Sequence, residues 1–358
     1  MSMQTGPAPV PAAAKAPVAP AGPPPIIKTG LTGASSNLAK VLNAGHFAVA
    51  IEVSPPVGPN PKNIERQIAT LKGFGDIYNV TDNQSAMVHC SSLAVSIMLK
   101  QAGMEPMVQF ACRDRNRLAM QADLLGASLF GINTVLAISG DHPKWGDHPD
   151  CKPVYDVDSM NLIRMFRMMR ENQVFENGEK IPVRAPDFFI GAVENPFAPP
   201  YDWRAYRVAK KIVAGAQFIQ TQLIYNVPRF EEFMKRIVDL GLHEKIAILA
   251  GVGPIRSAKV AEYMSKEVAG MDVPQEIVDK MRGLSKEDCE KYGVDLCCEI
   301  ANKVRSIEGV RGLHIMAVSW PDAVPKVAQN LGIFPRPVIA DPAPAAPAAA
   351  PAAKPATG

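Results

Sequence analysis

Short apolar runs alternate with longer amphipathic segments through residues 31–335. The runs are rich in β-branched and aromatic residues, as buried strands are, and the longer segments repeat apolar residues at helical spacing. The expected strands are Phe47–Val53, Asp76–Val80, Met107–Phe110, Thr134–Ile138, Phe188–Val193, Phe218–Gln222, Ile246–Ala250 and Gly312–Met316. The expected helices are Asn63–Lys72, Leu93–Ala102, Arg115–Leu125, Ser159–Glu171, Trp203–Val213, Arg229–Leu240, Ser257–Ser265 and Ala323–Leu331, with extra helices in Met271–Arg305.

These alternations predict an α/β protein built as a (β/α)8 TIM barrel, in one domain over residues 31–335. A doubly wound open sheet is the alternative architecture. That fold places a glycine-rich phosphate loop after its first strand. Here the first strand runs into Val53-Ser54-Pro55-Pro56 instead, which favours the barrel.

Both ends of the chain, residues 1–30 and 336–358, consist mostly of proline and alanine. Such segments cannot bury enough apolar surface to fold, so they are predicted to be disordered tails, either spacers or docking segments for another subunit. The whole chain is 47% hydrophobic and 20% charged, enough for a sizeable core. A formal net charge of +3 without a long basic run argues against nucleic acid or an anionic membrane as a partner.

Targeting and metal-binding patterns are missing from the sequence. No stretch has the apolar region of a signal peptide or the roughly 18 apolar residues of a membrane span, which predicts a cytoplasmic protein. The six cysteines form no CxxC pair and no cysteine–histidine zinc pattern, so they are expected to be reduced thiols and no metal site is predicted.

Polar residues stand where the barrel strands should end, which is where the active sites of TIM barrels lie. Glu52 lies inside the first apolar strand, where an unpaired carboxylate is costly, so it is either salt-bridged or catalytic. Gln222 is suited to hydrogen bonding a planar, donor- and acceptor-rich ring. His314 fits a buried core histidine, and the run from Arg204 to Lys211 fits either a solvated helix face or a phosphate site.

Three segments together resemble the methylenetetrahydrofolate reductase family. They are Glu52 before Pro55-Pro56, Ser139-Gly140-Asp141 after the fourth strand, and Gly215–Gln222 around the sixth. Taken alone, Ser139-Gly140-Asp141 would also fit a plain turn. In the same order and spacing as in the family, the similarity runs from Phe47 to Pro335.

The resemblance implies a flavin, normally FAD with FMN as the alternative, at the strand ends. It also implies reduction of 5,10-methylenetetrahydrofolate to 5-methyltetrahydrofolate in one-carbon metabolism and methionine biosynthesis. By position, Glu52 corresponds to the general acid, Asp141 to an acidic residue that tunes the flavin and contacts folate, and Gln222 to a substrate-binding glutamine. Flavin contacts are implied for Thr81, Gln109, Ser139, Gly140, Asp141, Tyr155 and Lys211.

The chain departs from the family pattern at several of these places. Gln109 stands where the family has a histidine, and Ser139 replaces an arginine or lysine. Ala258 stands where NADH-using members stack an aromatic residue on the adenine. The electron donor is therefore left open between NAD(P)H and a partner subunit with iron–sulfur centres, in a protein expected to be a homo-oligomer. Two other readings are a folate-binding barrel methyltransferase without flavin and a non-catalytic subunit of a redox complex.

Overall fold

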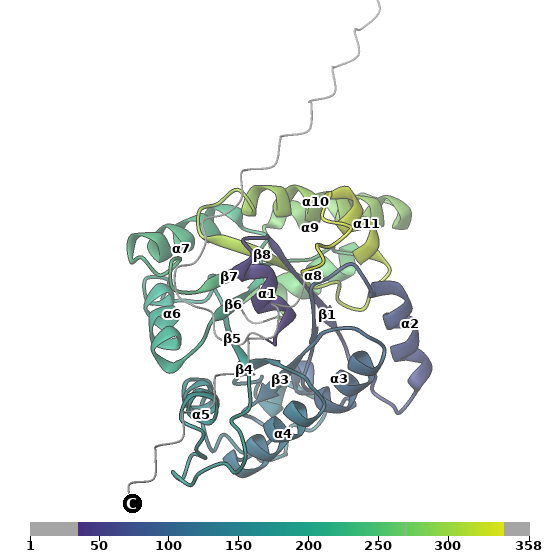
Figure 1. Cartoon of the computed structure of the whole chain (residues 1–358). Coiled ribbons are helices and arrows are strands. Elements are labelled where there is room, and N and C mark those ends of the chain that lie inside the picture. The colour runs from purple at the N-terminus through teal and green to yellow at the C-terminus, as the bar shows by residue number, and fades with distance from the viewer. Residues whose placement is uncertain (1–34, 269, 340–358) are drawn as a thin grey trace, which may run out of the picture.

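The computed structural model describes residues 35–268 and 270–339, which contain a closed barrel of eight parallel strands (Figure 1). The strands pair in chain order and β8 closes on β1, so the predicted (β/α)8 fold is confirmed and the open sheet is wrong. The strands are β1 (Ala48–Val53), β2 (Ile77–Val80), β3 (Pro106–Ala111), β4 (Thr134–Ile138), β5 (Phe189–Glu194), β6 (Phe218–Leu223), β7 (Ala247–Val252) and β8 (Val310–Ile315). The predicted tail at residues 1–30, and residues 340–358 of the other, lie outside the described residues.

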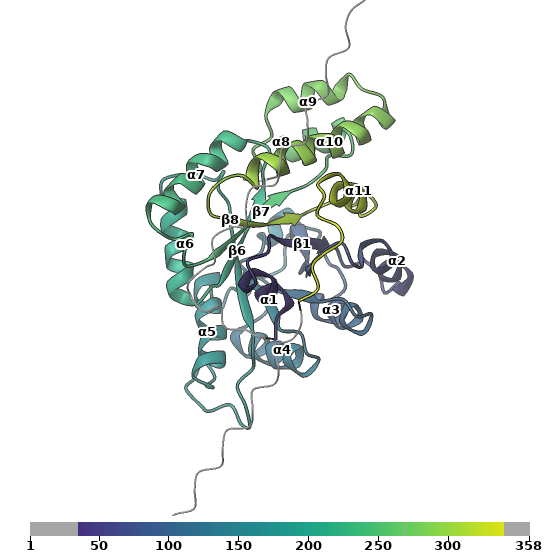
Figure 2. The ribbon, with the colours of Figure 1, turned by 45° about the horizontal axis from the view of Figure 1, so that its top comes forward.

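Helices alternate with the strands and surround the barrel (Figures 1 and 2). They are α2 (Pro61–Leu71), α3 (Ser92–Gln101), α4 (Arg117–Leu129), α5 (Ser159–Glu171), α6 (Trp203–Ala214), α7 (Val227–Asp239), α8 (Ala258–Lys266) and α11 (Ala323–Asn330). Ser257 caps α8, because its hydroxyl accepts a hydrogen bond from the Val260 amide. The expected extra helices are α9 (Gln275–Arg282) and α10 (Lys286–Val304), and the short 3-10 turns η1 (Gln84–Ala86) and η2 (Pro143–Trp145) follow β2 and β4.

The lower half of the barrel, at the N-terminal ends of the strands, is filled with apolar side chains. A helix that the sequence pattern did not predict, α1 (Asn37–Asn43), packs its buried residues into the same cluster as the inward-facing residues of the strands. Phe189 and Phe218 stack inside the barrel with ring centroids 5.1 Å apart. Gly191 makes room for them, since a Cβ atom there would lie 2.1 Å from the Phe218 ring. The space for a ligand is therefore at the other end.

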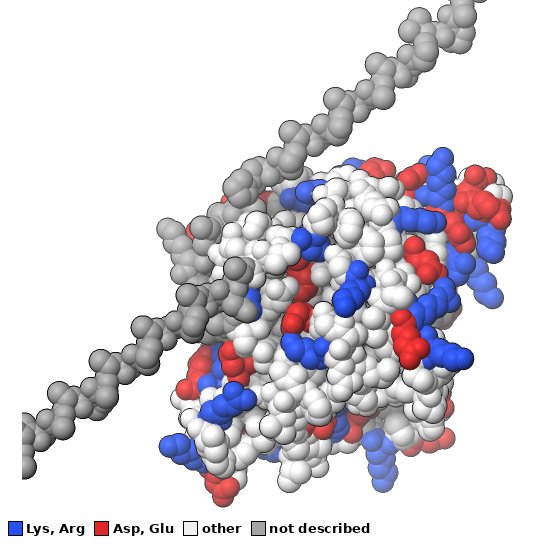
Figure 3. Space-filling model, turned by 45° about the vertical axis from the view of Figure 1, so that its right-hand side comes forward, with Lys and Arg blue, Asp and Glu red and all other residues white. Residues whose placement is uncertain are grey.

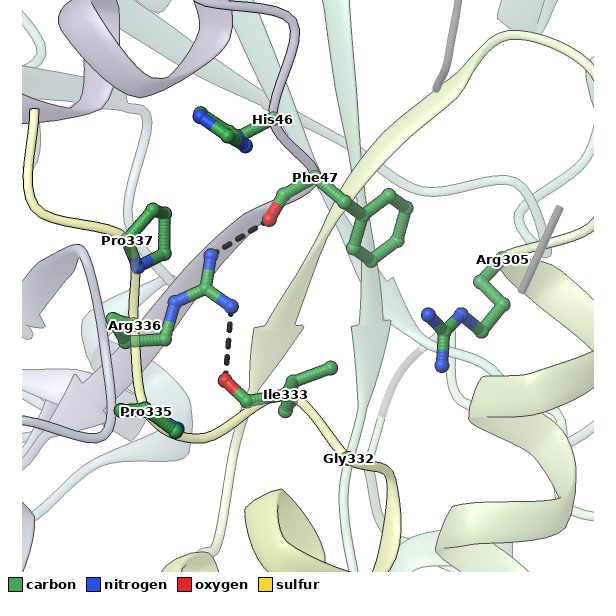
Figure 4. Close-up of a pocket in the computed structure, with 8 residues that line it drawn as sticks. All are labelled: His46, Phe47, Arg305, Gly332, Ile333, Pro335, Arg336 and Pro337. Atoms are coloured by element: carbon green, nitrogen blue, oxygen red, sulfur yellow. Dashed lines mark hydrogen bonds between the residues drawn. The ribbon is translucent and has the colours of Figure 1, made fainter. Parts of the chain in front are cut away.

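The segment after α11 returns to the N-terminal end of the barrel and is fastened there (Figure 4). The Arg336 guanidinium donates to both carboxylate oxygens of Asp76, at 3.0 and 2.6 Å, and to the carbonyls of Phe47 and Ile333, at 2.7 and 3.0 Å. Asp76 also accepts from the Val49 amide at 2.7 Å. Contacts with the barrel thus continue past residue 335, the predicted end of the domain.

The cysteines, the lengths of the helices, the possible metal ligands and the surface charges of the described residues add no further candidate site. All six cysteines are free. Within residues 35–268 and 270–339 no helix is long and apolar enough to cross a membrane, and no three metal-ligating side chains gather into a site. Positive and negative side chains are interspersed on the face that Figure 3 shows.

Candidate active site

A cavity of about 510 Å³ opens at the C-terminal ends of the strands. Side chains alternate between the two faces of a strand, so every second residue of each strand faces the barrel interior. These inward positions bring several polar side chains into the lining: Glu52, Asn79, Gln109, Gln220, Gln222 and His314. The volume is within the roughly 300–1,000 Å³ of small-molecule sites. The cavity is therefore large enough for a substrate or part of a cofactor.

Glu52 is the inward-facing residue near the end of β1, in register with Asn79 of β2. Burial raises the pKa of its carboxyl from 4.5 to about 7. Neither a neighbouring charge nor a hydrogen bond from the described residues opposes that rise, so of the two alternatives for Glu52 the salt bridge is not supported. A carboxyl with this pKa holds its proton about half the time at neutral pH and is suited to general acid chemistry.

A chain of hydrogen bonds crosses the cavity floor. The Asp82 amide donates to Oε1 of Gln109 at 3.3 Å, and Nε2 of Gln109 donates to Oδ1 of Asn79 at 3.2 Å. This leaves Nδ2 of Asn79 to donate to Nε2 of His314, at 3.3 Å. Burial lowers the pKa of His314 to about 3, so the imidazole is neutral and carries its proton on Nδ1.

Two buried polar groups at the cavity have no hydrogen-bond partner within the described part of the chain. They are Nδ1 of His314 and both amide atoms of Gln220, whose side chain lies inward on β6, two residues before Gln222. Leaving a buried donor or acceptor unpaired costs about 1–3 kcal/mol. A polar ligand or ordered water in the cavity would remove that cost.

The turn after β4 brings Gly140 and Asp141 to the rim of the cavity. Gly140 has φ of +82°, and a Cβ atom there would lie 3.2 Å from the Arg113 side chain. Arg113 donates to the carbonyl of Asp141 at 3.1 Å, and the Tyr155 hydroxyl donates to the carbonyl of Gly140 at 3.3 Å. The Asp141 side chain is exposed at the mouth of the cavity. Arg113 thus holds the backbone of the turn in place, while the Asp141 carboxylate stays accessible.

Three other predicted residues also line the cavity. The Thr81 hydroxyl donates to Oε1 of Gln84 at 2.8 Å, and Ser139 is exposed at the rim. Gln222 accepts a hydrogen bond from the Leu223 amide at 2.9 Å through Oε1. Its Nε2 is therefore the atom left to donate to a ligand.

A group of cations surrounds Glu194 at the end of β5. The Glu194 carboxylate lies 2.6 Å from Nζ of Lys211, 3.3 Å from Arg204 and 3.6 Å from Arg207. Burial lowers the pKa of Lys211, and the adjacent Glu194 carboxylate opposes that shift. The Arg207 side chain is 49% exposed, whereas the Lys211 side chain is 4% exposed. Three cations against one carboxylate leave positive charge at the mouth, so this helix face is not merely solvated.

Of the predicted site residues, all except Tyr155 line this one cavity, and Tyr155 contacts it through Gly140. Asn79 and Gln220 are two of the lining residues that were not predicted. Each lies two positions before a predicted residue, Thr81 or Gln222, and so faces the same side of its strand. That spacing was the signal in the sequence.

The family model for methylenetetrahydrofolate reductase matches residues 37–332, almost all of the described barrel. The chain belongs to the methylenetetrahydrofolate reductase family. This confirms the resemblance seen in the sequence.

Named members of the family are distant relatives. A "Probable methylenetetrahydrofolate reductase (NADPH)" of Caenorhabditis elegans is 24% identical over 80% of this chain and 42% of its own length. A "Methylenetetrahydrofolate reductase (NADH) 1" of Zea mays is 23% identical over 86% of this chain and 53% of its own length. A 5,10-methylenetetrahydrofolate reductase of Pectobacterium carotovorum is 22% identical over 67% of this chain and 74% of its own length. The chain thus spans about half the length of the animal and plant relatives.

Among solved structures, a Clostridium thermocellum protein has a similar fold, with a TM-score of 0.57 and 17% identity. The similarity covers 82% of this chain and 95% of that one. That protein is described as uncharacterized and as binding two copies of 5-methyl-5,6,7,8-tetrahydrofolic acid. At this level of identity the likeness shows the shared fold.

Proposed function

We propose that this protein is a flavin-dependent reductase that converts 5,10-methylenetetrahydrofolate to 5-methyltetrahydrofolate. The observation that carries the proposal is Glu52, an inward-facing carboxyl without a charged partner in the described residues and with its pKa raised to about 7. The folate ring opens when a carbon–nitrogen bond breaks and the departing nitrogen takes a proton. Glu52 donates that proton, and the one-carbon unit is left as an iminium ready to accept hydride.

The cavity fits a flavin on three counts. The unpaired Gln220 amide would bind a polar ring, and Gly140 lets the backbone approach it. Positive charge around Glu194 suits phosphate. When bound there, FAD or FMN would supply the hydride.

The residues proposed to hold the flavin are Thr81, Gln109, Ser139, Gly140, Asp141, Tyr155 and Lys211. Because Lys211 is buried against Glu194, the half-exposed Arg207 is the better placed group for a phosphate contact, with Lys211 keeping Glu194 neutralised.

Folate is proposed to bind through Asp141 and Gln222. The Asp141 carboxylate is exposed at the mouth and Nε2 of Gln222 remains to donate, which matches a ring with both donors and acceptors. The names of the relatives, and the folate described for the C. thermocellum protein, support this substrate.

The electrons are proposed to come from NAD(P)H or from a partner subunit with iron–sulfur centres. The relatives are named for NADPH in one case and NADH in another. Ala258, the first residue of α8, offers no aromatic face for an adenine, which keeps the partner subunit in consideration. We place the reaction in cytoplasmic one-carbon metabolism that feeds methionine biosynthesis.

A visible spectrum of the purified protein tests the cofactor, followed by anaerobic addition of NADH and then of methylenetetrahydrofolate. A flavin bleached by NADH and reoxidised by folate supports the reductase with direct electron transfer. A flavin that only chemical reduction bleaches, and that folate reoxidises, points to a partner subunit. Absence of flavin, even after incubation with FAD or FMN, would refute the proposal and favour the folate-binding methyltransferase.

The acid is tested with Glu52→Gln. We expect normal flavin content and a fall in folate reduction of at least about 100-fold, since positioned acids contribute about 10²–10⁴ in rate. Glu65→Gln, the same change on the exposed face of α2, is the control and should leave turnover unchanged. Wild-type folate turnover by Glu52→Gln would show that Glu52 is not the acid.

A further inference from the structure

The imidazole of His314 lies beside Glu52 in the barrel wall. Strands β1 and β8 are hydrogen-bonded neighbours, with His314 in register with Ala50, two residues before Glu52. Ala50 is small, so the imidazole reaches across it to Asn79, which is the register partner of Glu52 on the other side. Glu52, Asn79 and His314 therefore meet at one place in the cavity lining.

One nitrogen of His314 is committed and the other is not. Nε2 accepts from Asn79, whose carbonyl is fixed by Gln109, so the direction of the chain places the proton on Nδ1. That N–H is buried and has no partner within the described residues. The Glu52 carboxyl also lacks a partner there. A donor without an acceptor and a carboxyl without a donor thus lie on neighbouring strands.

The other titratable or charged groups at the cavity are Asp82, Arg113, Asp141, Glu194, Arg204, Arg207 and Lys211. Asp82 is paired with Arg115 and Arg113 with Asp114. Glu194 is surrounded by its three cations. None of these groups contributes to the shift of the Glu52 pKa, which burial alone produces.

We propose that His314 is a positioning residue for Glu52, whose carboxylate accepts the Nδ1–H hydrogen bond once it has given its proton to the substrate. The proposal rests on the proposed role of Glu52 as the acid. The proton passes from Glu52 to the departing folate nitrogen as the carbon–nitrogen bond breaks. His314 keeps its own proton throughout and stays neutral. Its hydrogen bond stabilises the carboxylate that forms, and this makes Glu52 a stronger acid.

Two substitutions separate this role from a structural one. The amide group of asparagine ends near the place of Nδ1, where its nitrogen can donate as Nδ1 does. The amide group of glutamine ends near the place of Nε2, where its oxygen can accept from Nδ2 of Asn79 as Nε2 does. His314→Asn therefore keeps a donor for Glu52 and loses the contact with Asn79. His314→Gln keeps the contact with Asn79 and loses the donor for Glu52.

The experiment is a pH titration of the Glu52 carboxyl band by infrared difference spectroscopy, with the band assigned by its loss in Glu52→Gln. We expect His314→Gln to raise the titration midpoint by about one pH unit, a tenfold change in the ionisation constant, because a hydrogen bond to a charged group is lost. His314→Asn should stay near the wild-type midpoint. Gln220→Leu is the control and should not move it, because it removes an unpaired amide on β6, a strand that does not pair with β1.

An unchanged midpoint in His314→Gln overturns the proposal. So does a shift in His314→Asn alone, which would show that His314 acts only by supporting Asn79. The titration needs neither flavin nor folate. If the protein shows the expected shift but has no reductase activity, the pairing of His314 with Glu52 stands and the proposed function is refuted. If the protein is an active reductase but lacks the shift, the proposed function stands and the pairing is refuted. In an active enzyme, the basic limb of the kcat profile should move with the midpoint.

Discussion

Replacing Glu52 by glutamine should change how the stability of the barrel depends on pH. The carboxyl holds its proton up to about pH 7 in the folded chain but loses it near pH 4.5, its ordinary value, when unfolded. Between these values the folded state binds more protons, so the wild-type free energy of unfolding falls as the pH rises. Below pH 4.5 the contribution is fully present, and above pH 7 it has been lost.

The size of the effect follows from the shift. A rise from 4.5 to about 7 corresponds to at most about 3 kcal/mol, since one pKa unit is worth about 1.4 kcal/mol and solvent in the cavity screens part of it. Glutamine does not ionise and carries no such loss. The stability of Glu52→Gln relative to wild type should therefore increase by about 3 kcal/mol between pH 4.5 and pH 8.

Urea unfolding of both proteins at a series of pH values measures this difference, with the linear extrapolation done at each pH. Glu65→Gln, on the exposed face of α2, controls for the loss of a negative charge and should differ from wild type by the same amount throughout. If the Glu52→Gln and wild-type stabilities run parallel from pH 4.5 to pH 8, the carboxyl is not the isolated buried group described here.

Other variants test other parts of the structure. Arg336→Ala should lower the free energy of unfolding in urea by about 3 kcal/mol, because it leaves the buried Asp76 carboxylate without its cation. Arg66→Ala breaks an exposed pair and should lower it by less than about 1 kcal/mol. Equal losses in the two variants would contradict this. Gly140→Ala should lower stability by about 1–2 kcal/mol and weaken flavin binding, because φ is +82°; an unchanged flavin titration would argue against a close approach there. Gln222→Leu should raise KM for folate about tenfold with flavin content unchanged, and an unaltered KM would remove Gln222 from the substrate site.

The alternation of apolar runs was enough to predict the barrel, because most residues of each strand are buried and the strands are largely apolar. Helix α1 was missed because seven residues contain too few turns to show a period. Its formation depends on Ser36, which caps it, and on the apolar barrel interior that receives its buried face. That tertiary contact cannot be read from the local pattern.

The site was predictable where side chains stand at strand ends, and less so where partners come from elsewhere. The spacing of Arg207 and Lys211 on α6 is that of a solvated face. Lys211 turns inward because Glu194 arrives from β5 and neutralises it. Likewise His314 was expected in the core, and its unpaired nitrogen became visible only once Asn79 was placed beside it. These pairings depend on the register of strands, which the sequence does not state.

Helix α1 and the stacked rings of Phe189 and Phe218 give the barrel a closed floor. Within the described part of the chain, the cavity that Glu52 lines opens at the C-terminal ends of the strands. Two ligands that bind in this cavity one after the other would then use the same opening. Such a cavity favours sequential occupancy, in which the first ligand leaves before the second one binds.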